Sequence, residues 1–307
     1  MVFHFQHFLK ALLLGLFTLF LANLHITGDI TKYINPKYDF MSKMAAICFF
    51  VLLLIQVTRI WQEKHTHHVC SHRCNPDHGN SHWSLRRVVS YSIIAFPIIT
   101  GFMIPPATLD SSIAANKGFL LSQGSSEGRN GGTERKSLME GAESLVEKEG
   151  IDIYSSDHVP LPNENYLSEE EYDGKLQLLQ QSESIQMTED MFSTYYEEIN
   201  DNLESYIGKK IKLSGFVFKE EGLTSNQLVI SRFLITHCIA DASIIGFLTE
   251  FSGAKTIQED AWVEIEGVLE VGNYNGYDLP LLKATSLNVI DEPSEPYIYP
   301  VLKVLGN

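Results

Sequence analysis

Histidine and cysteine side chains crowd into one short stretch of this sequence. Eight fall inside eighteen residues: His65, His67, His68, Cys70, His72, Cys74, His78 and His82. Imidazole and thiolate are the usual zinc ligands in proteins, and this density can supply four donors without a preformed fold. The Cys70-x-x-x-Cys74 spacing is acceptable for zinc, although the histidines fit no single structural-zinc template. The stretch predicts binding of zinc or a similar transition metal, and the alternative is a polar loop that binds none.

A second group of charged or reactive side chains is set into the apolar run 228–248. It consists of Arg232, His237, Cys238 and Asp241. Because a buried charge is costly unless it is paired, Arg232 is expected to meet a carboxylate, and Asp241 is the nearest candidate along the chain. One interpretation is a structural ion pair. The other is that these four residues form a ligand or partner site.

The run that carries them is rich in β-branched and aromatic residues, and its apolar side chains fall on both alternating faces. This pattern predicts a strand, or a pair of strands, covered on both sides. We therefore expect residues 228–248 to form the core of a soluble domain.

The charge of the 307-residue chain changes sharply near Pro106. Residues 1–106 hold nine Lys or Arg against four Asp or Glu, which leaves 14 basic and 34 acidic residues in the remainder. An acidic surface repels phosphate backbones, so we expect no nucleic-acid binding by the second part. Cations or a basic partner fit it better.

Three apolar stretches precede Pro106. Each of Phe8–Ile26, Met41–Ile60 and Val88–Ile104 is read as a helix that crosses the membrane and contacts lipid. Pro97 and Gly101 predict a bend in the third helix, or a packing groove for a neighbouring helix. Residues 1–106 are thus predicted to be a three-span membrane domain, in which the His/Cys-rich loop 62–85 joins the second and third spans.

Loop charge predicts the orientation of these spans. The loop before the third span and its adjoining ends carry Arg59, Lys64, Arg73, Arg86 and Arg87. The positive-inside rule then places the amino terminus and the His/Cys loop in the cytoplasm. The predicted location is the plasma membrane, multi-pass, with an extracellular C-terminal domain.

The rest of the chain is predicted to hold three regions. Residues 107–165, rich in Gly, Ser and Glu, read as a flexible acidic tether, and 166–205 as a helical segment that Ser168 can cap. Residues 206–307 show five β segments with glycines inside two of them, a pattern typical of a small closed barrel. The predicted fold class is a membrane-anchored multi-domain protein with an all-β OB-like barrel and flanking helices. The alternative is a five-stranded sheet of another topology.

These features resemble the YcgQ-like family of bacterial membrane proteins, proposed subunits of two-component permeases. The matching segments are Tyr206-Ile207-Gly208-Lys209-Lys210, Gly215-Phe216-Val217, Ser231-Arg232-Phe233, Ala240-Asp241-Ala242 and Trp262-Val263, beside the apolar spans and the His-rich loop. The family has two adjacent cysteines where this chain has His237-Cys238, a pair that can still bind metal. The resemblance implies a separate, polytopic permease-like partner in the membrane, and it supplies no catalytic mechanism.

The leading hypothesis is accordingly a non-catalytic accessory subunit of a permease complex, whose acidic outer domain captures or gates solute or contacts the partner. The alternative is a membrane protein that handles or senses metal through the His/Cys loop. An enzyme is disfavoured because the sequence has no P-loop or HExxH motif.

Overall fold

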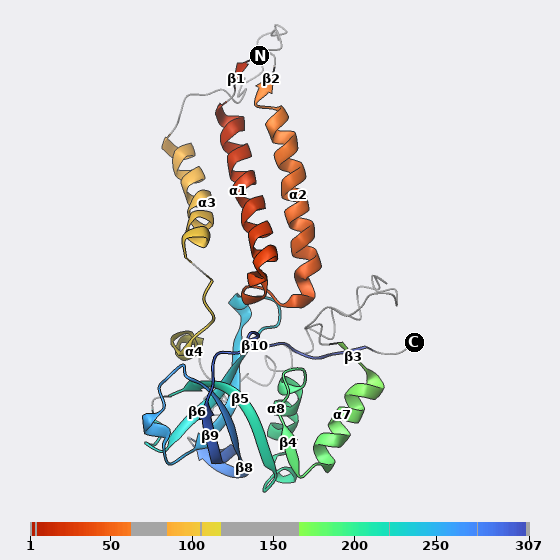
Figure 1. Cartoon of the computed structure of the whole chain (residues 1–307), viewed down its shortest axis with the longest axis vertical. Helices are drawn as coiled ribbons and strands as arrows, with labels where there is room; N and C mark the ends of the chain where they lie inside the picture. The colour runs from red at the N-terminus through yellow and green to blue at the C-terminus, as the bar shows by residue number, and fades with distance from the viewer. Residues whose placement is uncertain are drawn as a thin grey trace. The chain divides into compact units, whose positions relative to one another are not determined.

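A computed structural model describes most of the chain (Figure 1). The described residues are 2–3, 5–62, 85–104, 106–117, 166–220, 222–274 and 276–304. They divide into two compact units, Met1–Ala107 and Thr108–Asn307. Each unit is described by itself.

The first unit is built on a helical hairpin. Helices α1 (Phe5–Thr27) and α2 (Asp39–Thr58) lie side by side, as Figure 1 shows. The turn between them contains the 3₁₀ helices η1 (Asp29–Lys32) and η2 (Pro36–Tyr38). The short strands β1 (Val2–Phe3) and β2 (Trp61–Gln62) pair at the other end of the hairpin.

Among the described residues of this unit, two helices are long and apolar enough to cross a membrane. They are Gln6–Thr27 and Pro36–Thr58. In the most apolar 18-residue stretch of each, only 11% and 6% of the stretch is buried, unlike the core helix of a soluble protein. A third helix, α3 (Leu85–Met103), covers the third predicted span, but its apolar part, Val89–Met103, is shorter. The hairpin matches the first two predicted spans, and the third span stays a prediction.

Of the two roles expected for Gly101, a bend or a packing groove, the contacts of α3 favour packing. A Cβ atom at this position would lie 2.8 Å from the Phe20 ring of α1, so a larger residue would require that ring to shift. The Phe20 ring also meets Phe102 edge-on, with ring centroids 5.4 Å apart. Phe20 of α1 therefore packs against α3 at Gly101, while Pro97 lies within α3.

The second unit begins with short helices and strands around a larger sheet. The elements before the sheet core are α4 (Ser111–Lys117), β3 (Tyr166–Ser168), α7 (Glu169–Gln181), β4 (Ser184–Gln186), α8 (Phe192–Asp201) and η4 (Leu203–Ser205). The long strands are β5 (Lys210–Phe218), β6 (Gln227–Leu234), β7 (Ser243–Glu250), β8 (Trp262–Tyr274) and β9 (Tyr277–Val289), with η5 (Ile239–Asp241) and η6 (Ala254–Thr256) between them. The last strands are β10 (Tyr297–Ile298) and β11 (Leu302–Val304).

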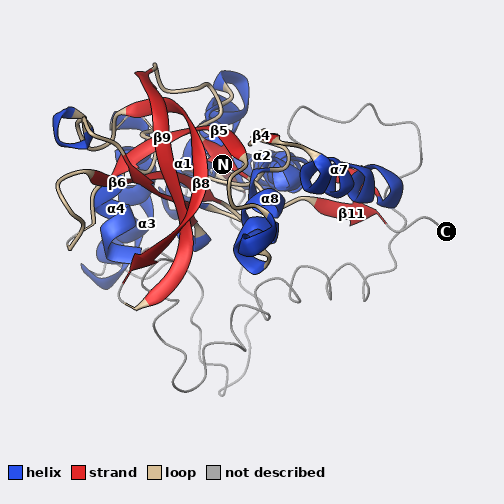
Figure 2. Cartoon of the chain, turned by 90° about the horizontal axis from the view of Figure 1, so that it is seen from below, coloured by secondary structure: helices blue, strands red, loops and turns tan. Residues whose placement is uncertain are grey.

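The long strands are hydrogen-bonded in a cycle. Strand β5 pairs with β6, β6 with β7, β7 with β9, β9 with β8, and β8 with β5 again. All pairs are antiparallel except β7 with β9, which is parallel. Figure 2 shows the long, curved β8 and β9 crossing the other strands. The expectation that 228–248 forms a core strand pair is confirmed, because β6 and β7 pair along their whole length.

Glycines allow the close strand contacts. A Cβ on Gly215 would lie 2.6 Å from the Ser231 carbonyl oxygen, and one on Gly267 would lie 2.5 Å from that of Lys283. Gly267 also sits at a register shift between β8 and β9. Such bulges bend a strand sharply, which agrees with the coiling role predicted for these two positions.

Apolar side chains form two clusters in this unit. One joins inward-facing residues of all five long strands to Phe192, Tyr196 and Ile199 of α8. The other lies on the opposite faces of β5, β6, β7 and β9 and is covered by α4 and β10. Residues 228–248 contribute to both clusters, as expected for strands covered on both sides.

The helical segment follows its sequence signals. Ser168 caps α7 in a capping box with Glu171, as its position before the glutamates predicted. The tether differs from expectation at its start: residues 111–117 form α4, packed on the second cluster through Ala114. The remaining tether residues, 118–165, lie outside the described part of the chain.

Candidate functional site

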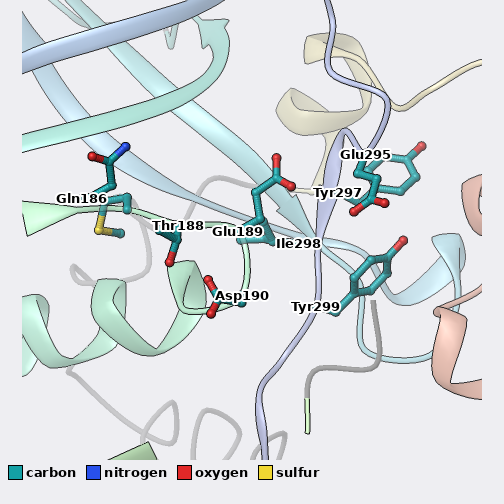
Figure 3. Close-up of a pocket in the computed structure, with 9 residues that line it drawn as sticks. Gln186, Thr188, Glu189, Asp190, Glu295, Tyr297, Ile298 and Tyr299 are labelled. Carbon is teal, nitrogen blue, oxygen red and sulfur yellow. The ribbon is translucent and has the colours of Figure 1, made fainter. Parts of the chain in front are cut away.

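A pocket of about 500 Å³ opens in the second unit between two edge strands of the sheet. One wall is the segment from the end of β4 towards α8, and the other is β10 with its flanking residues (Figure 3). The lining residues are Gln186, Met187, Thr188, Glu189, Asp190, Glu295, Tyr297, Ile298 and Tyr299. Three carboxylates and two phenols thus converge on one cavity, a combination suited to a cationic or polar guest.

Arg232 of β6 links the two walls of the pocket. Its Nη2 donates to Glu189 Oε1 (3.2 Å) on one wall and to the Glu295 carbonyl oxygen (2.9 Å) on the other. Its Nε donates to the Pro296 carbonyl oxygen (3.2 Å). The side chain is 1% exposed, and its guanidinium lies 5.1 Å from the Trp262 ring centroid. A planar donor fork can join several backbone segments at once, and Arg232 does so here.

The position of Arg232 follows from strand divergence. Strands β5 and β6 pair only from Phe216–Ser231 to Phe218–Val229. Beyond this point Arg232 Nη1 reaches the carbonyl oxygen (3.5 Å) and hydroxyl (3.4 Å) of Ser214, taking the place of lost ladder bonds. Burial lowers the pKa of the guanidinium, and the charge of Glu189 opposes that shift.

The expected pairing of Arg232 with Asp241 is wrong. Arg232 forms its ion pair with Glu189, 43 positions earlier in the chain. Asp241 is used locally, because it ends the tight turn η5 and its carboxylate accepts hydrogen bonds within that turn. Proximity in sequence could not foresee a carboxylate delivered by another segment.

His237, Cys238 and Asp241 do come together, in the loop between β6 and β7. Asp241 Oδ2 lies 2.9 Å from both the backbone nitrogen and the Nδ1 of His237, and its Oδ1 accepts from the Cys238 backbone nitrogen at 3.1 Å. The His237 side chain is 51% exposed. The carboxylate thus fixes the loop and orients the imidazole, an arrangement that also suits a histidine presented to a ligand.

The charges of the pocket are partly compensated. Burial alone would raise the pKa of Asp190, but hydrogen bonds from Lys175 and Thr188 outweigh it and hold that pKa below its usual value. Burial, followed by the charge of Glu295, raises the pKa of the Tyr299 phenol. The tyrosine therefore stays a neutral hydrogen-bonding group beside the carboxylates.

The predicted zinc ligands cannot be placed in this structure. His65, His67, His68, Cys70, His72, Cys74, His78 and His82 all lie outside the described residues. Within the described ranges, no group of three or more His, Cys, Asp or Glu side chains is arranged to hold a metal ion. The zinc prediction for the loop remains untested by the geometry.

Sequence reasoning missed most of the pocket. Glu189 and Asp190 lie in an ordinary-looking connection before α8, and Glu295, Tyr297 and Tyr299 lie in the segment PSEPYIYP. The recurrence of Pro, Glu and Tyr in that segment was the available signal. None of the nine lining residues was singled out as a site residue, but Arg232, which joins the two walls, was.

Two family models match the chain, one in each half. Residues 9–120 match the model of the DUF1980 N-terminal domain, and residues 147–300 match that of the DUF1980 C-terminal domain. The chain is 32% identical to the UPF0703 protein YcgQ of Bacillus subtilis (strain 168) over 304 residues, which cover 94% of this chain and 98% of that protein. The chain belongs to the DUF1980, or YcgQ-like, family. The resemblance identified from the sequence is therefore confirmed.

A second DUF1980 relative carries a functional name. It is the "Putative two-component membrane permease complex subunit" of Streptococcus mutans serotype c (strain ATCC 700610 / UA159), 26% identical over 285 residues, which cover 91% of this chain and 94% of that protein. In the present DUF1980 chain the pocket lies wholly within the segment that matches the C-terminal domain model.

Proposed function

We propose that this protein is a non-catalytic accessory subunit of a membrane permease complex. The observation that carries the proposal is the near full-length similarity to a relative named as a subunit of such a complex. The two long apolar helices fit a membrane component, since few of their residues are buried within the described structure. A polytopic permease-like protein in the same membrane is the proposed partner, beside lipid.

The second unit serves, in this proposal, as the contact or capture domain. Its cycle of five strands, with β7 and β9 parallel, supports an OB-like barrel, and the pocket lies between the edge strands β4 and β10 added to that cycle. The chain has a formal net charge of −15, which argues against nucleic acid as the guest of such a barrel. The carboxylates of the pocket favour a cationic solute or a basic segment of the partner instead.

The proposed orientation keeps the amino terminus cytoplasmic and the second unit outside the cell. Its support is the excess of Lys and Arg in the loop before α3. A membrane-impermeant thiol reagent applied to intact cells tests it. Labelling of Cys70 or Cys74 before lysis would reverse the orientation.

Affinity purification of the tagged full-length protein from native membranes tests the subunit assignment. We expect a polytopic membrane protein in fixed stoichiometry. The variant Glu295→Gln removes one pocket charge but keeps the carbonyl that Arg232 uses, so it should weaken retention of the partner if the pocket is the contact. Glu292→Gln, a nearby exposed change, is the matched control. Recovery of a lone protein would overturn the proposal, and a lone protein carrying zinc would favour metal handling.

A further inference from the structure

Residues 108–117, here called the latch, are hydrogen-bonded to distant parts of the second unit. The Leu109 backbone nitrogen donates to the Tyr297 hydroxyl (3.0 Å), although the two residues are 188 positions apart. Ser111 donates to Asp260 twice, from its backbone nitrogen (2.6 Å) and from its hydroxyl (2.9 Å). The side chain that caps α4 is Asp110, whose Oδ1 accepts from the backbone nitrogens of Ser112 (3.1 Å) and Ile113 (3.3 Å). Asp260, in the loop before β8, instead anchors the start of the helix through Ser111.

The latch also buries apolar surface. Ala114 is 0% exposed within the second cluster, and Leu109 and Ile113 pack against the same cluster. Its neighbour Ala115 is exposed. One side of this short helix is therefore fitted to the sheet, and the other faces away from it.

The latch has the properties of a two-state element. Helix α4 spans only seven residues, too few to be stable without its packing surface. Asp260 has a φ of 64°, a left-handed conformation that its backbone bond to the Val217 carbonyl oxygen (2.9 Å) holds, so its carboxylate is already positioned for Ser111. Undocking would therefore unwind α4 and leave its receptor in place, so docked and released states are distinct.

One side chain belongs to both the latch contact and the pocket. Tyr297 lines the pocket, and its hydroxyl accepts the bond from Leu109. Its ring meets Phe233 of β6 edge-on at 6.4 Å, which fixes the position of that hydroxyl. The adjoining carbonyls of Glu295 and Pro296 are held by Arg232. A change in this wall must therefore move the acceptor on which the latch depends.

We propose that the latch is a conformational device that couples the pocket wall, residues 295–299, to the chain that follows α3. Helix α3 ends at Met103, five positions before the latch begins. A docked latch fixes the chain at that point, and a released latch frees it. The inference rests on contacts within the second unit and does not depend on the permease assignment.

Hydrogen exchange of the full-length protein in lipid nanodiscs tests the docking. Asp260→Gly removes both acceptors of Ser111 and suits the left-handed backbone, and we expect amide exchange in 109–117 to rise about tenfold, the factor expected for loss of two docking hydrogen bonds. Glu259→Ala, the loss of the adjacent exposed acid, should leave that exchange unchanged. Equal exchange in the two variants would overturn the docked latch.

Reciprocity tests the coupling, because two linked sites must affect each other equally. Ala114→Gln cannot fit the buried position and should speed exchange both in 109–117 and in 295–299, whereas Ala115→Gln on the exposed side should change neither. Faster exchange in 109–117 with no change in 295–299 would overturn the coupling. If Ala114→Gln also loosens the core of β8, Tyr297→Phe is the second variant, because it removes only the hydroxyl that the latch and the pocket share. Tyr297→Phe should speed amide exchange in 109–117. No change in that exchange would refute the coupling.

Discussion

Replacing Arg232 by lysine separates two explanations for a buried charge in this fold. If Arg232 is present mainly for its ion pair, lysine should serve, because it keeps the charge beside Glu189. If it is present to join backbone segments, lysine should fail, since one ammonium nitrogen cannot reach the Ser214, Glu189 and Glu295–Pro296 acceptors together. The geometry favours the second explanation.

The magnitude follows from the acceptors left without a donor. Leaving a buried acceptor unsatisfied costs about 1–3 kcal/mol, and at least two are stranded, which gives about 2–6 kcal/mol. Glu189→Gln should cost less than about 1 kcal/mol, because the Glu189 side chain is 49% exposed and the amide oxygen can still accept from Nη2. The expected order is therefore a large loss for Arg232→Lys and a small one for Glu189→Gln.

Urea unfolding of residues 108–307 provides the assay, since they form one compact unit. Trp262 is the only tryptophan in this range and lies against the Arg232 guanidinium, so its fluorescence reports on the site. With an m-value of about 2 kcal/mol/M, the midpoint should fall by about 1–3 M for Arg232→Lys. Equal midpoints for the two variants, or a larger loss for Glu189→Gln, would refute the reasoning.

Four further predictions test other parts of the chain. Ser168→Ala removes the capping box of α7 and should cost about 1 kcal/mol, measured by urea unfolding, with faster exchange confined to α7. Gly246→Ala places a Cβ 2.2 Å from the Ile230 carbonyl oxygen and should lower the free energy of unfolding by about 1–3 kcal/mol. Gly174→Ala, which has open space around it in α7, should raise the free energy of unfolding by about 0.5–1 kcal/mol. A change of the same sign in both variants would contradict this. Burial raises the pKa of the Glu220 carboxyl group despite a hydrogen bond from Tyr274. The folded protein therefore favours the neutral carboxyl group, and the free energy of unfolding should fall as pH rises through the raised pKa. Glu220→Gln should flatten this fall between pH 4 and 8. A peptide of residues 65–82 should bind zinc with micromolar or better affinity (about −8 kcal/mol) at pH 7.5 and more weakly below about pH 6, and an absence of binding heat in calorimetry would remove the metal interpretation.

The sequence predicted the local elements better than the long-range partners. The β segments, the Ser168 cap and the roles of Gly215 and Gly267 depend on short patterns, and the structure has them. Arg232 was correctly recognised as a buried charge needing partners, but those partners lie 43 positions before it and 64 positions after it in the chain. No local periodicity carries that information.

The same limit explains the missed latch and pocket. Residues 111–117 look like the start of a polar linker. Asp110 caps the helix locally, but its packing depends on the distant Asp260 and the second cluster. Glu189 and Glu295 become neighbours of one cavity because β5 and β6 diverge between them. Composition can flag an acidic domain, but it cannot show where two loops meet.

The last two strands, β10 at the edge of the large sheet and β11 in a separate two-stranded sheet, have a consequence for synthesis of the protein. Strand β10 pairs with β6 and β11 pairs with β3, so residues 297–304 complete partners made roughly 60 to 140 residues earlier. Until those residues leave the ribosome, β6 and β3 each lack that strand neighbour, and Arg232 lacks the two carbonyls that follow β9. Because these strand pairs form late and between distant parts of the chain, the edges of β6 and β3 stay exposed after the apolar helices have been synthesised. Premature termination within the last dozen residues should therefore yield chains that reach the membrane but aggregate or are degraded there.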